Sequence, residues 1–279
     1  MPGANAKALD KARSLPADTL IFDLEDAVAP EAKADARAAI LATMPQGGYG
    51  QREIIIRANA LSTEWGRDDV FAAAQAKPDG VLFPKIDSAA DIRAAEALLT
   101  EAGAPESTAI WAMIETPKAI LNIQKIAKAT KRTRLTTFVM GVNDLAKDMR
   151  SAQTDDRTAF LAPLTLAVIA ARAYGITPID GVYNDIQNAV GFEAICRQGL
   201  ALGFDGKTLI HPSQIDICNT IFSPTAAEVV WSRAVIAAFA DPANAGKGVL
   251  KVDGKMTELL HLAQAQRTVA IADAIAGMN

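Results

Sequence analysis

The sequence predicts an α/β fold, a (β/α)8 TIM barrel whose first strand is missing or trimmed, with a C-terminal helical extension. Short apolar, β-branched runs alternate with Ala-rich amphipathic stretches along the chain. Successive runs start roughly 26 to 42 residues apart, a spacing typical of repeated strand–helix segments. Each run is nearly continuous in hydrophobicity, which favours strands that are covered on both faces, as in a parallel sheet.

Seven apolar runs are the predicted strands. They span 19–26, 52–59, 80–85, 109–116, 135–144, 177–183 and 205–212. A closed barrel needs eight strand–helix repeats, and the missing strand is expected to be the first, because a helix predicted over 4–15 has almost nothing before it. The start codon is misassigned, the chain is trimmed, or the barrel is open at this seam. An open doubly wound sheet is the structural alternative, and it would require a reversal of strand order.

Helix signals lie between the strands. Thr116 followed by Pro117 is typical of an N-cap and a first helical residue. The segments SAAD (88–91) and TAAE (225–228) resemble capping boxes.

The pattern changes after the last predicted strand. We expect residues 1–222 to form the catalytic barrel domain and residues 223–279 to form a helical lid or oligomerisation extension. Within this tail, helices are predicted over 222–240 and 256–275, on either side of a turn-rich segment at 241–255.

Composition excludes several classes of function. The 279 residues carry 28 Lys and Arg against 32 Asp and Glu, a formal net charge of −4 that argues against nucleic-acid binding. Two cysteines do not make a disulfide framework or a Cys-rich zinc site. No apolar run approaches the ~18 residues that a membrane span needs. Because the first residues lack an apolar signal core, we expect a cytoplasmic protein that binds no membrane.

Charged side chains follow nearly every predicted strand, where the active site of a parallel barrel lies. They are Asp23, Glu25, Asp26, Arg57, Lys85, Glu115, Asp144, Asp180 and His211. Lys85, Asp180 and His211 are predicted to bind substrate. Glu115 and Asp144 end adjacent strands and could converge on Mg²⁺, which prefers one or two carboxylates and takes its other oxygens from water and substrate. The alternative is that both carboxylates cap the helices that follow them.

Other sequence motifs are missing. The chain contains no GxGxxG and no GxSxG, so neither a dinucleotide fold nor a serine-hydrolase triad is predicted.

Several segments together resemble the HpcH/HpaI aldolase–citrate lyase superfamily. They are LIFDLEDAVAPEAKADAR (20–37), IIIRAN (54–59), MIETPKAILN (113–122), MGVNDLAKDM (140–149), IDGVYND (179–185), GFDGKTLIHPSQI (203–215) and KVDGKM (251–256). Within the superfamily, the chain is most similar to stand-alone citrate-lyase-beta-like CoA-ester enzymes, the malyl-CoA lyase and malyl-CoA thioesterase group. The resemblance implies a Mg²⁺-binding barrel that forms homotrimers or hexamers. One departure is that the family's Arg-Ser strand before Pro2-Gly3 is not present here.

The resemblance also implies residue roles. Glu115 and Asp144 match the Mg²⁺ ligands, and Arg57 matches an arginine that grips the substrate carboxylate or carbonyl. Glu25 and Asp26 match an acidic pair near the waters of the metal. Asp253 matches an aspartate that reaches the active site of a neighbouring subunit and moves a proton there, although an Asp-Gly pair is by itself typical of a plain turn.

The leading functional hypothesis is a Mg²⁺-dependent carbon–carbon lyase that cleaves a 3-hydroxyacyl-CoA such as malyl-CoA to acetyl-CoA and glyoxylate. One alternative is a malyl-CoA thioesterase, which would use the same site to release malate and free coenzyme A. Another is a citrate lyase beta-type subunit of a larger complex. The products distinguish the first two, and co-purification with other subunits would favour the third.

Overall fold

The computed structural model describes residues 1–278, which form two compact units, Met1–Cys218 and a second that begins at Asn219. Each unit is described by itself. No helix in residues 1–278 is both long enough and apolar enough to cross a membrane.

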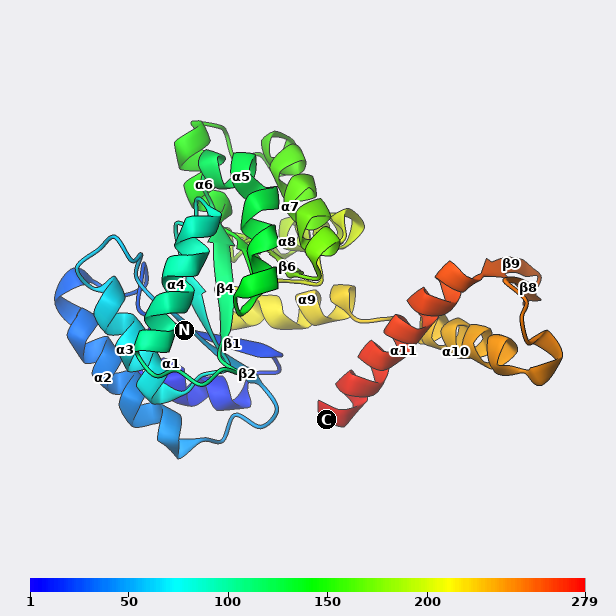
Figure 1. Ribbon diagram of the computed structural model, residues 1–279, viewed down its shortest axis with the longest axis horizontal. Coiled ribbons are helices and arrows are strands. Elements are labelled where there is room, and N and C mark those ends of the chain that lie inside the picture. The colour runs from blue at the N-terminus through cyan, green and yellow to red at the C-terminus, as the bar shows by residue number, and fades with distance from the viewer. Residues whose placement is uncertain (279) are drawn as a thin grey trace. The chain divides into compact units, whose positions relative to one another are not determined.

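The first unit is built on a sheet of seven parallel strands (Figure 1). The strands are β1 (Thr19–Asp23), β2 (Glu53–Arg57), β3 (Gly80–Phe83), β4 (Ala109–Ile114), β5 (Leu135–Met140), β6 (Thr177–Asp180) and β7 (Gly206–Lys207). They lie in sequence order from β1 to β7, each hydrogen-bonded in parallel to the next. Strand order therefore never reverses, which excludes the doubly wound alternative and gives an open, TIM-barrel-like half-barrel. Each strand is shorter than its predicted run.

A short segment before the first helix pairs with the open edge of β1. Pro2 forms an isolated parallel bridge with Asp23, the Asp23 N–H donates to the Met1 carbonyl, and the Gly3 N–H donates to the Asp23 carbonyl. The few residues before the first helix therefore pair with this edge through a single bridge rather than a full strand.

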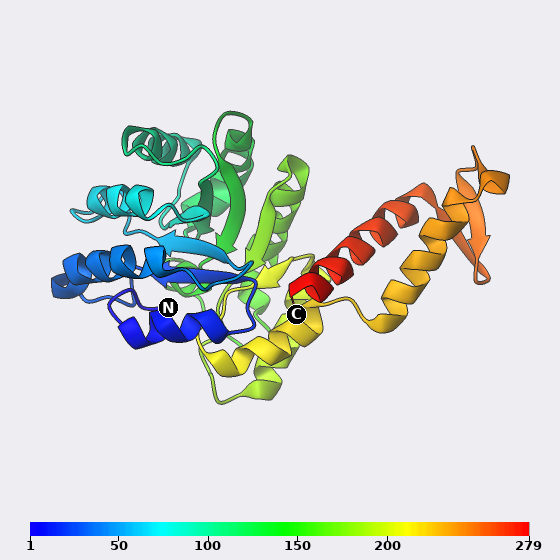
Figure 2. The same cartoon turned by 90° about the horizontal axis from the view of Figure 1, so that it is seen from below.

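Helices follow the strands and cover the outer face of the sheet. They are α1 (Ala6–Lys11), α2 (Lys33–Thr43), α3 (Gly66–Ala76), α4 (Ala89–Glu101), α5 (Pro117–Ala127), α6 (Val142–Met149), α7 (Leu161–Tyr174), α8 (Ala189–Leu202) and α9 (Ile215–Phe222). In Figure 2, α2, α3 and α4 stack side by side outside the strands. Thr116 caps α5 as predicted, since its Oγ1 accepts from the Ala119 N–H. The capping box predicted at 88–91 was wrong, because Ser88 makes no side-chain cap bond to a helix N–H.

The inner face of the half-barrel is apolar in its middle layer and charged at the carboxyl ends of the strands. Ile55, Leu82, Trp111, Met113 and Val139 form a buried cluster between the strands. Strand side chains alternate between the two faces, so the residues that follow this layer on the same face emerge at the carboxyl ends of the strands. That alternation positions the charged site described below.

The second unit is a helical hairpin with a β-hairpin at one end. It contains α10 (Ala226–Ala240), β8 (Val249–Val252), β9 (Lys255–Glu258) and α11 (Leu259–Met278). Thr225 and Glu228 form the predicted capping box at the start of α10. Val235, Val252 and Ala265 form a core of its own.

The tail differs from its prediction in two details. The helix expected over 222–240 is interrupted between Phe222 and Ala226, at Pro224, a residue that cannot donate to a continuing helix. The segment 241–255, predicted as turn-rich, also carries β8 and the start of β9, two strands that were not predicted. Asp253 and Gly254 are the two hairpin turn residues, and both have positive φ, 49° and 80°, as a type I′ turn requires.

Candidate active site

Two carboxylates converge on one ammonium group at the carboxyl ends of the strands. Glu115 follows β4, Asp144 lies in the first turn of α6, and Lys85 follows β3. The Lys85 Nζ lies 2.6 Å from Asp144 Oδ1 and 3.4 Å from Glu115 Oε1. The Lys85 backbone N–H also donates to Glu115 Oε1, at 2.7 Å. The two predicted metal ligands therefore face a single cation position.

Local backbone features hold this arrangement. Gly141 precedes α6, and a Cβ there would lie closer than 3.0 Å to Glu115 Cβ and Oε2, so only glycine lets the turn close over the carboxylate. Lys85 has a φ of 55°, a left-handed conformation that costs a non-glycine residue roughly 1–2 kcal/mol. Such outliers cluster at functional sites, where the surrounding structure holds them.

An arginine lies among three carboxylates at the ends of β1 and β2. Asp23 accepts from Arg57 Nε at 2.7 Å and from Nη2 at 2.5 Å. Arg57 Nη1 lies 2.9 Å from Glu25 Oε2 and 3.5 Å from Asp26 Oδ2. The first contact is an ion pair without hydrogen-bond geometry, because Glu25 Oε2 is buried and has no hydrogen-bond partner. Asp23 thus orients the guanidinium through Nε and Nη2. Nη1 faces Glu25 and Asp26 and donates to Met113 Sδ at 3.9 Å.

Burial separates the pKa values of these acids. It raises the pKa of Glu25 to about 8, despite the opposing charge of Arg57. Burial also raises the pKa of Glu115 above its usual range. At Asp23 burial acts in the same direction, but the paired Arg57 guanidinium outweighs it and lowers the pKa. Acids with separated pKa values in one place are typical of active sites.

The pair Glu115 and Asp144 fits a magnesium ion. Mg²⁺ is usually held by one or two carboxylates together with water and substrate oxygens, and both carboxylates already face a cationic group. Within the described residues, no group of three or more His, Cys, Asp or Glu side chains could hold a metal ion. The capping alternative fails for Glu115, because Thr116 caps α5.

Asp180 and His211 lie apart from this chemistry. Asp180 is fully buried, and its carboxylate accepts from Arg157 Nη1 at 2.8 and 2.9 Å and from Lys207 Nζ at 3.0 Å. The Asp180 side chain has no exposed surface in this structure, and its substrate-binding role stays a prediction. His211 is exposed, and its Nδ1 pairs with Ser213 Oγ at 2.8 Å.

Sequence reasoning missed four residues that support the Glu25 loop or neutralise Asp180. Lys33 and Asn59 donate to the backbone behind Glu25, and Arg157 and Lys207 neutralise Asp180. Lys33 and Asn59 stand inside segments quoted above, but nothing in a sequence tells a buried lysine from a solvated one.

Asp253 belongs to the second unit. It is exposed in the turn of the β8–β9 hairpin.

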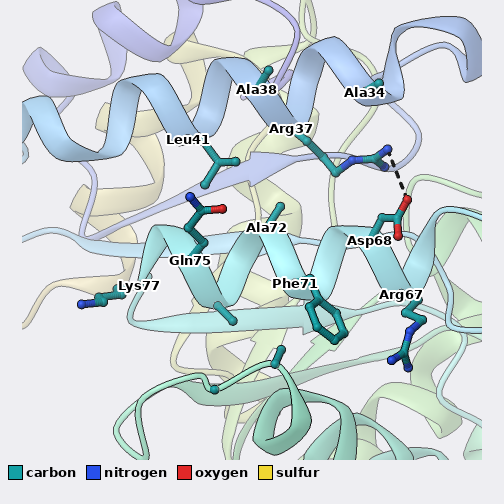
Figure 3. Close-up of a pocket in the computed structure, with 13 residues that line it drawn as sticks. Ala34, Arg37, Ala38, Leu41, Arg67, Asp68, Phe71, Ala72, Gln75 and Lys77 are labelled. Atoms are coloured by element: carbon teal, nitrogen blue, oxygen red, sulfur yellow. Dashed lines mark ion pairs between the residues drawn. The ribbon is translucent and has the colours of Figure 1, made fainter.

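Two cavities of the first unit are lined by other residues. A groove of about 950 Å³ runs along α3 on the outer helical layer and also involves residues of α2 and the segment after α4. Figure 3 shows Arg37 of α2 facing Asp68 of α3, with Phe71 pointing away from α2. A second cavity, of about 1080 Å³, opens near the amino ends of the strands, beside Thr19 and Thr177. Neither contains the carboxylates described above, so the candidate site is defined by its charges rather than by a deep cavity.

Fold and site together define a TIM-barrel-like α/β protein in which two carboxylates, Glu115 and Asp144, surround Lys85 at the carboxyl ends of the strands. The HpcH/HpaI aldolase/citrate lyase family matches residues 1–212, and the chain belongs to this family.

Named relatives extend over nearly the whole chain. It is 48% identical over 279 residues to a (3S)-malyl-CoA thioesterase of Cereibacter sphaeroides, covering 100% of this chain and 95% of the relative. It is 37% identical over 263 residues to citrate lyase subunit beta of Escherichia coli, covering 92% and 86%. Among solved structures, CitE of Mycobacterium tuberculosis in complex with magnesium, acetoacetate and coenzyme A matches with a TM-score of 0.77 and 27% identity, covering 98% and 96%.

Proposed function

We propose that this chain is a Mg²⁺-dependent thioesterase that hydrolyses malyl-CoA, or a CoA ester of a closely similar hydroxydicarboxylic acid, to the free acid and coenzyme A. The observation that carries the proposal is the 48% identity with a (3S)-malyl-CoA thioesterase over the full length of this chain. It favours hydrolysis over the carbon–carbon cleavage that was the leading hypothesis from sequence.

Glu115 and Asp144 would hold the magnesium ion. The complex of M. tuberculosis CitE contains magnesium and coenzyme A, which supports a magnesium ion and a CoA ester as the ligands that this chain binds. A bound Mg²⁺ supplies Lewis acidity to substrate oxygens and orients them. Lys85, 40% exposed beside both carboxylates, is free to turn toward the substrate when an ion takes its place.

Arg57 would bind the acyl carboxylate or the thioester carbonyl through Nη1. Asp23 engages Nε and Nη2, which fixes the plane of the guanidinium before the substrate arrives. A preoriented donor of this kind lowers the cost of stabilising developing negative charge.

Glu25 is the candidate proton carrier. With a pKa of about 8, roughly one-tenth of its carboxyl groups are ionised at pH 7. The ionised Oε2 can take a proton from the water that attacks the thioester carbonyl. The protonated form can return it to the departing thiolate, so that water adds its hydroxyl to the acyl group and its proton to sulfur. Asp26, 72% exposed beside Arg57, would help to hold that water.

Asp253 would complete the site of a neighbouring subunit in a homotrimer. Its support is the exposed hairpin turn on a unit with its own core. Mixing an Asp253→Ala chain with a Glu115→Ala chain under conditions that exchange subunits should restore part of the activity, because some sites then combine an intact barrel with an intact hairpin. Exchange without any recovery would contradict a shared site.

The deciding experiment is incubation of the purified protein with malyl-CoA and Mg²⁺, with free thiol, malate, glyoxylate and acetyl-CoA measured in parallel. The proposal expects malate and free coenzyme A in equal amounts. Glyoxylate with acetyl-CoA would establish the lyase instead. Glu115→Gln and Asp144→Asn should abolish turnover and Mn²⁺ binding, whereas Glu193→Gln, a change of an exposed carboxylate on α8, should change neither.

A further inference from the structure

Lys33 is a buried lysine whose described partners are carbonyl oxygens and an aromatic face rather than a carboxylate. It is the first residue of α2 and only 5% exposed. Its Nζ donates to the carbonyl oxygens of Leu24 and Glu25, at 2.8 Å each, and lies 5.3 Å from the ring centroid of Trp65. Burying an ammonium without a counter-charge is costly. A specific interaction must therefore explain why a lysine, rather than an apolar residue, occupies this position.

Satisfying the two carbonyl groups is not a sufficient reason. The Leu24 carbonyl also accepts from Asn59 Nδ2 at 2.7 Å, and the Glu25 carbonyl also accepts from the Val28 N–H at 3.0 Å. Each oxygen would keep one donor if the lysine were replaced by an apolar side chain. What Lys33 alone adds is a charge-assisted bond that joins two successive carbonyl groups, and such bonds are roughly twice as strong as neutral ones.

The opposite side of the same loop is held by an anion. Asp23 accepts from the Glu25 N–H at 2.8 Å and from the Ala27 N–H at 3.0 Å, while the same carboxylate pairs with Arg57. The loop that carries Glu25 and Asp26 is therefore fixed by a cation on its carbonyl groups and by an anion on its amides. The Asp23 carboxylate also orients Arg57, so one side chain holds both the loop and the guanidinium.

We propose that Lys33 is a positioning residue that fixes the Glu25–Asp26 loop against Arg57, without contacting the substrate. The inference deepens the proposed function, on which its catalytic consequence rests. Displacing a reacting group by about 1 Å can cost on the order of 100-fold in rate, so a loop held at both its carbonyl and its amide groups is a direct way to keep Glu25 in register with Arg57.

The test is Lys33→Met, which fills a similar volume with neither charge nor donor, compared with Lys125→Met at an exposed position on α5. Hydrogen exchange of the amides of residues 25–28 should accelerate about tenfold or more in the first variant while the other strand and helix amides keep their protection. With malyl-CoA, kcat should fall by about 10- to 100-fold with KM changed less than about threefold, the pattern of a lost transition-state interaction. Lys125→Met should leave both measurements unchanged.

Unchanged exchange at residues 25–28, or a uniform loss of protection with kcat intact, would overturn the proposal. If Lys33→Met does not fold, Trp65→Leu removes the aromatic face under the ammonium and should give the same pattern at smaller amplitude; protection and kcat equal to those of the unmodified chain would then refute it. If the unmodified protein does not hydrolyse malyl-CoA, the proposed function fails, while the exchange measurement still decides whether Lys33 holds the loop.

Discussion

Replacing Asp180 by asparagine should destabilise the first unit by about 3–5 kcal/mol, the usual cost of breaking a buried ion pair by removing one partner. The change conserves shape, so it opens no cavity. It leaves the Lys207 side chain, which is fully buried, and the Arg157 side chain, which is 9% exposed, facing a neutral amide. Arg157 keeps only its bond to Gln198, and Lys207 keeps the Gly181 carbonyl.

Urea unfolding measures this cost. A Trp231→Phe background confines tryptophan fluorescence to Trp65 and Trp111, which both belong to the first unit. The matched control is Glu193→Gln, which breaks the exposed pair with Arg197 and should cost less than about 1 kcal/mol. An Asp180→Asn loss below about 1 kcal/mol would refute the reasoning. A stable variant with a raised KM for malyl-CoA would instead support the substrate-binding role predicted from sequence.

Three further changes test the site itself. Gly141→Ala should weaken Mn²⁺ binding by about tenfold or more, measured by calorimetry, because the new Cβ displaces Glu115; unchanged affinity would show that the carboxylate is not a ligand. Arg57→Lys should lower kcat/KM nearly as much as Arg57→Ala, since lysine cannot reproduce the fork held by Asp23. Glu25→Gln should flatten the fall in the free energy of unfolding between about pH 4.5 and 8: the raised pKa means that the folded chain binds more protons than the unfolded chain there, so stability is lost as pH rises. Parallel stability curves for variant and unmodified protein would contradict that shift.

The strands of the first unit could be predicted because most of their residues are buried or half-buried, which keeps each run nearly continuous in hydrophobicity. A run such as REIIIRAN has no other stable environment than the inside of a sheet, and β2 forms within it. The positions of Glu115, Asp144 and Arg57 followed, since the carboxyl ends of parallel strands meet at one edge. Strand ends were less predictable, because β7 keeps only Gly206 and Lys207 of an eight-residue run.

The hairpin of the second unit was missed for an identifiable reason. Asp253-Gly254 is a strong signal for a two-residue turn, but Val249-Leu250 and Lys255-Met256 on either side lack the clean alternation that announces a half-buried strand. Only Val252 and Thr257 are buried, one from each strand. The strands pack on the two flanking helices, through Val235 and Ala265, and no pattern within the strands themselves reports these contacts.

The sequence could not distinguish acids that are held in permanent ion pairs from acids whose cationic partner can be exchanged. The two kinds differ in the burial of the lysine or arginine that each acid faces. Asp180 is matched by Lys207, which has no exposed surface, and Asp23 by Arg57, held through two nitrogens. Neither cation can leave without exposing a buried charge. Lys85, by contrast, is 40% exposed, sits on a strained backbone, and touches Glu115 and Asp144 through a single flexible ammonium. A metal ion can replace that contact at little cost, because the lysine can extend into water. This difference supports the proposal that Glu115 and Asp144, whose cation is exchangeable, hold Mg²⁺.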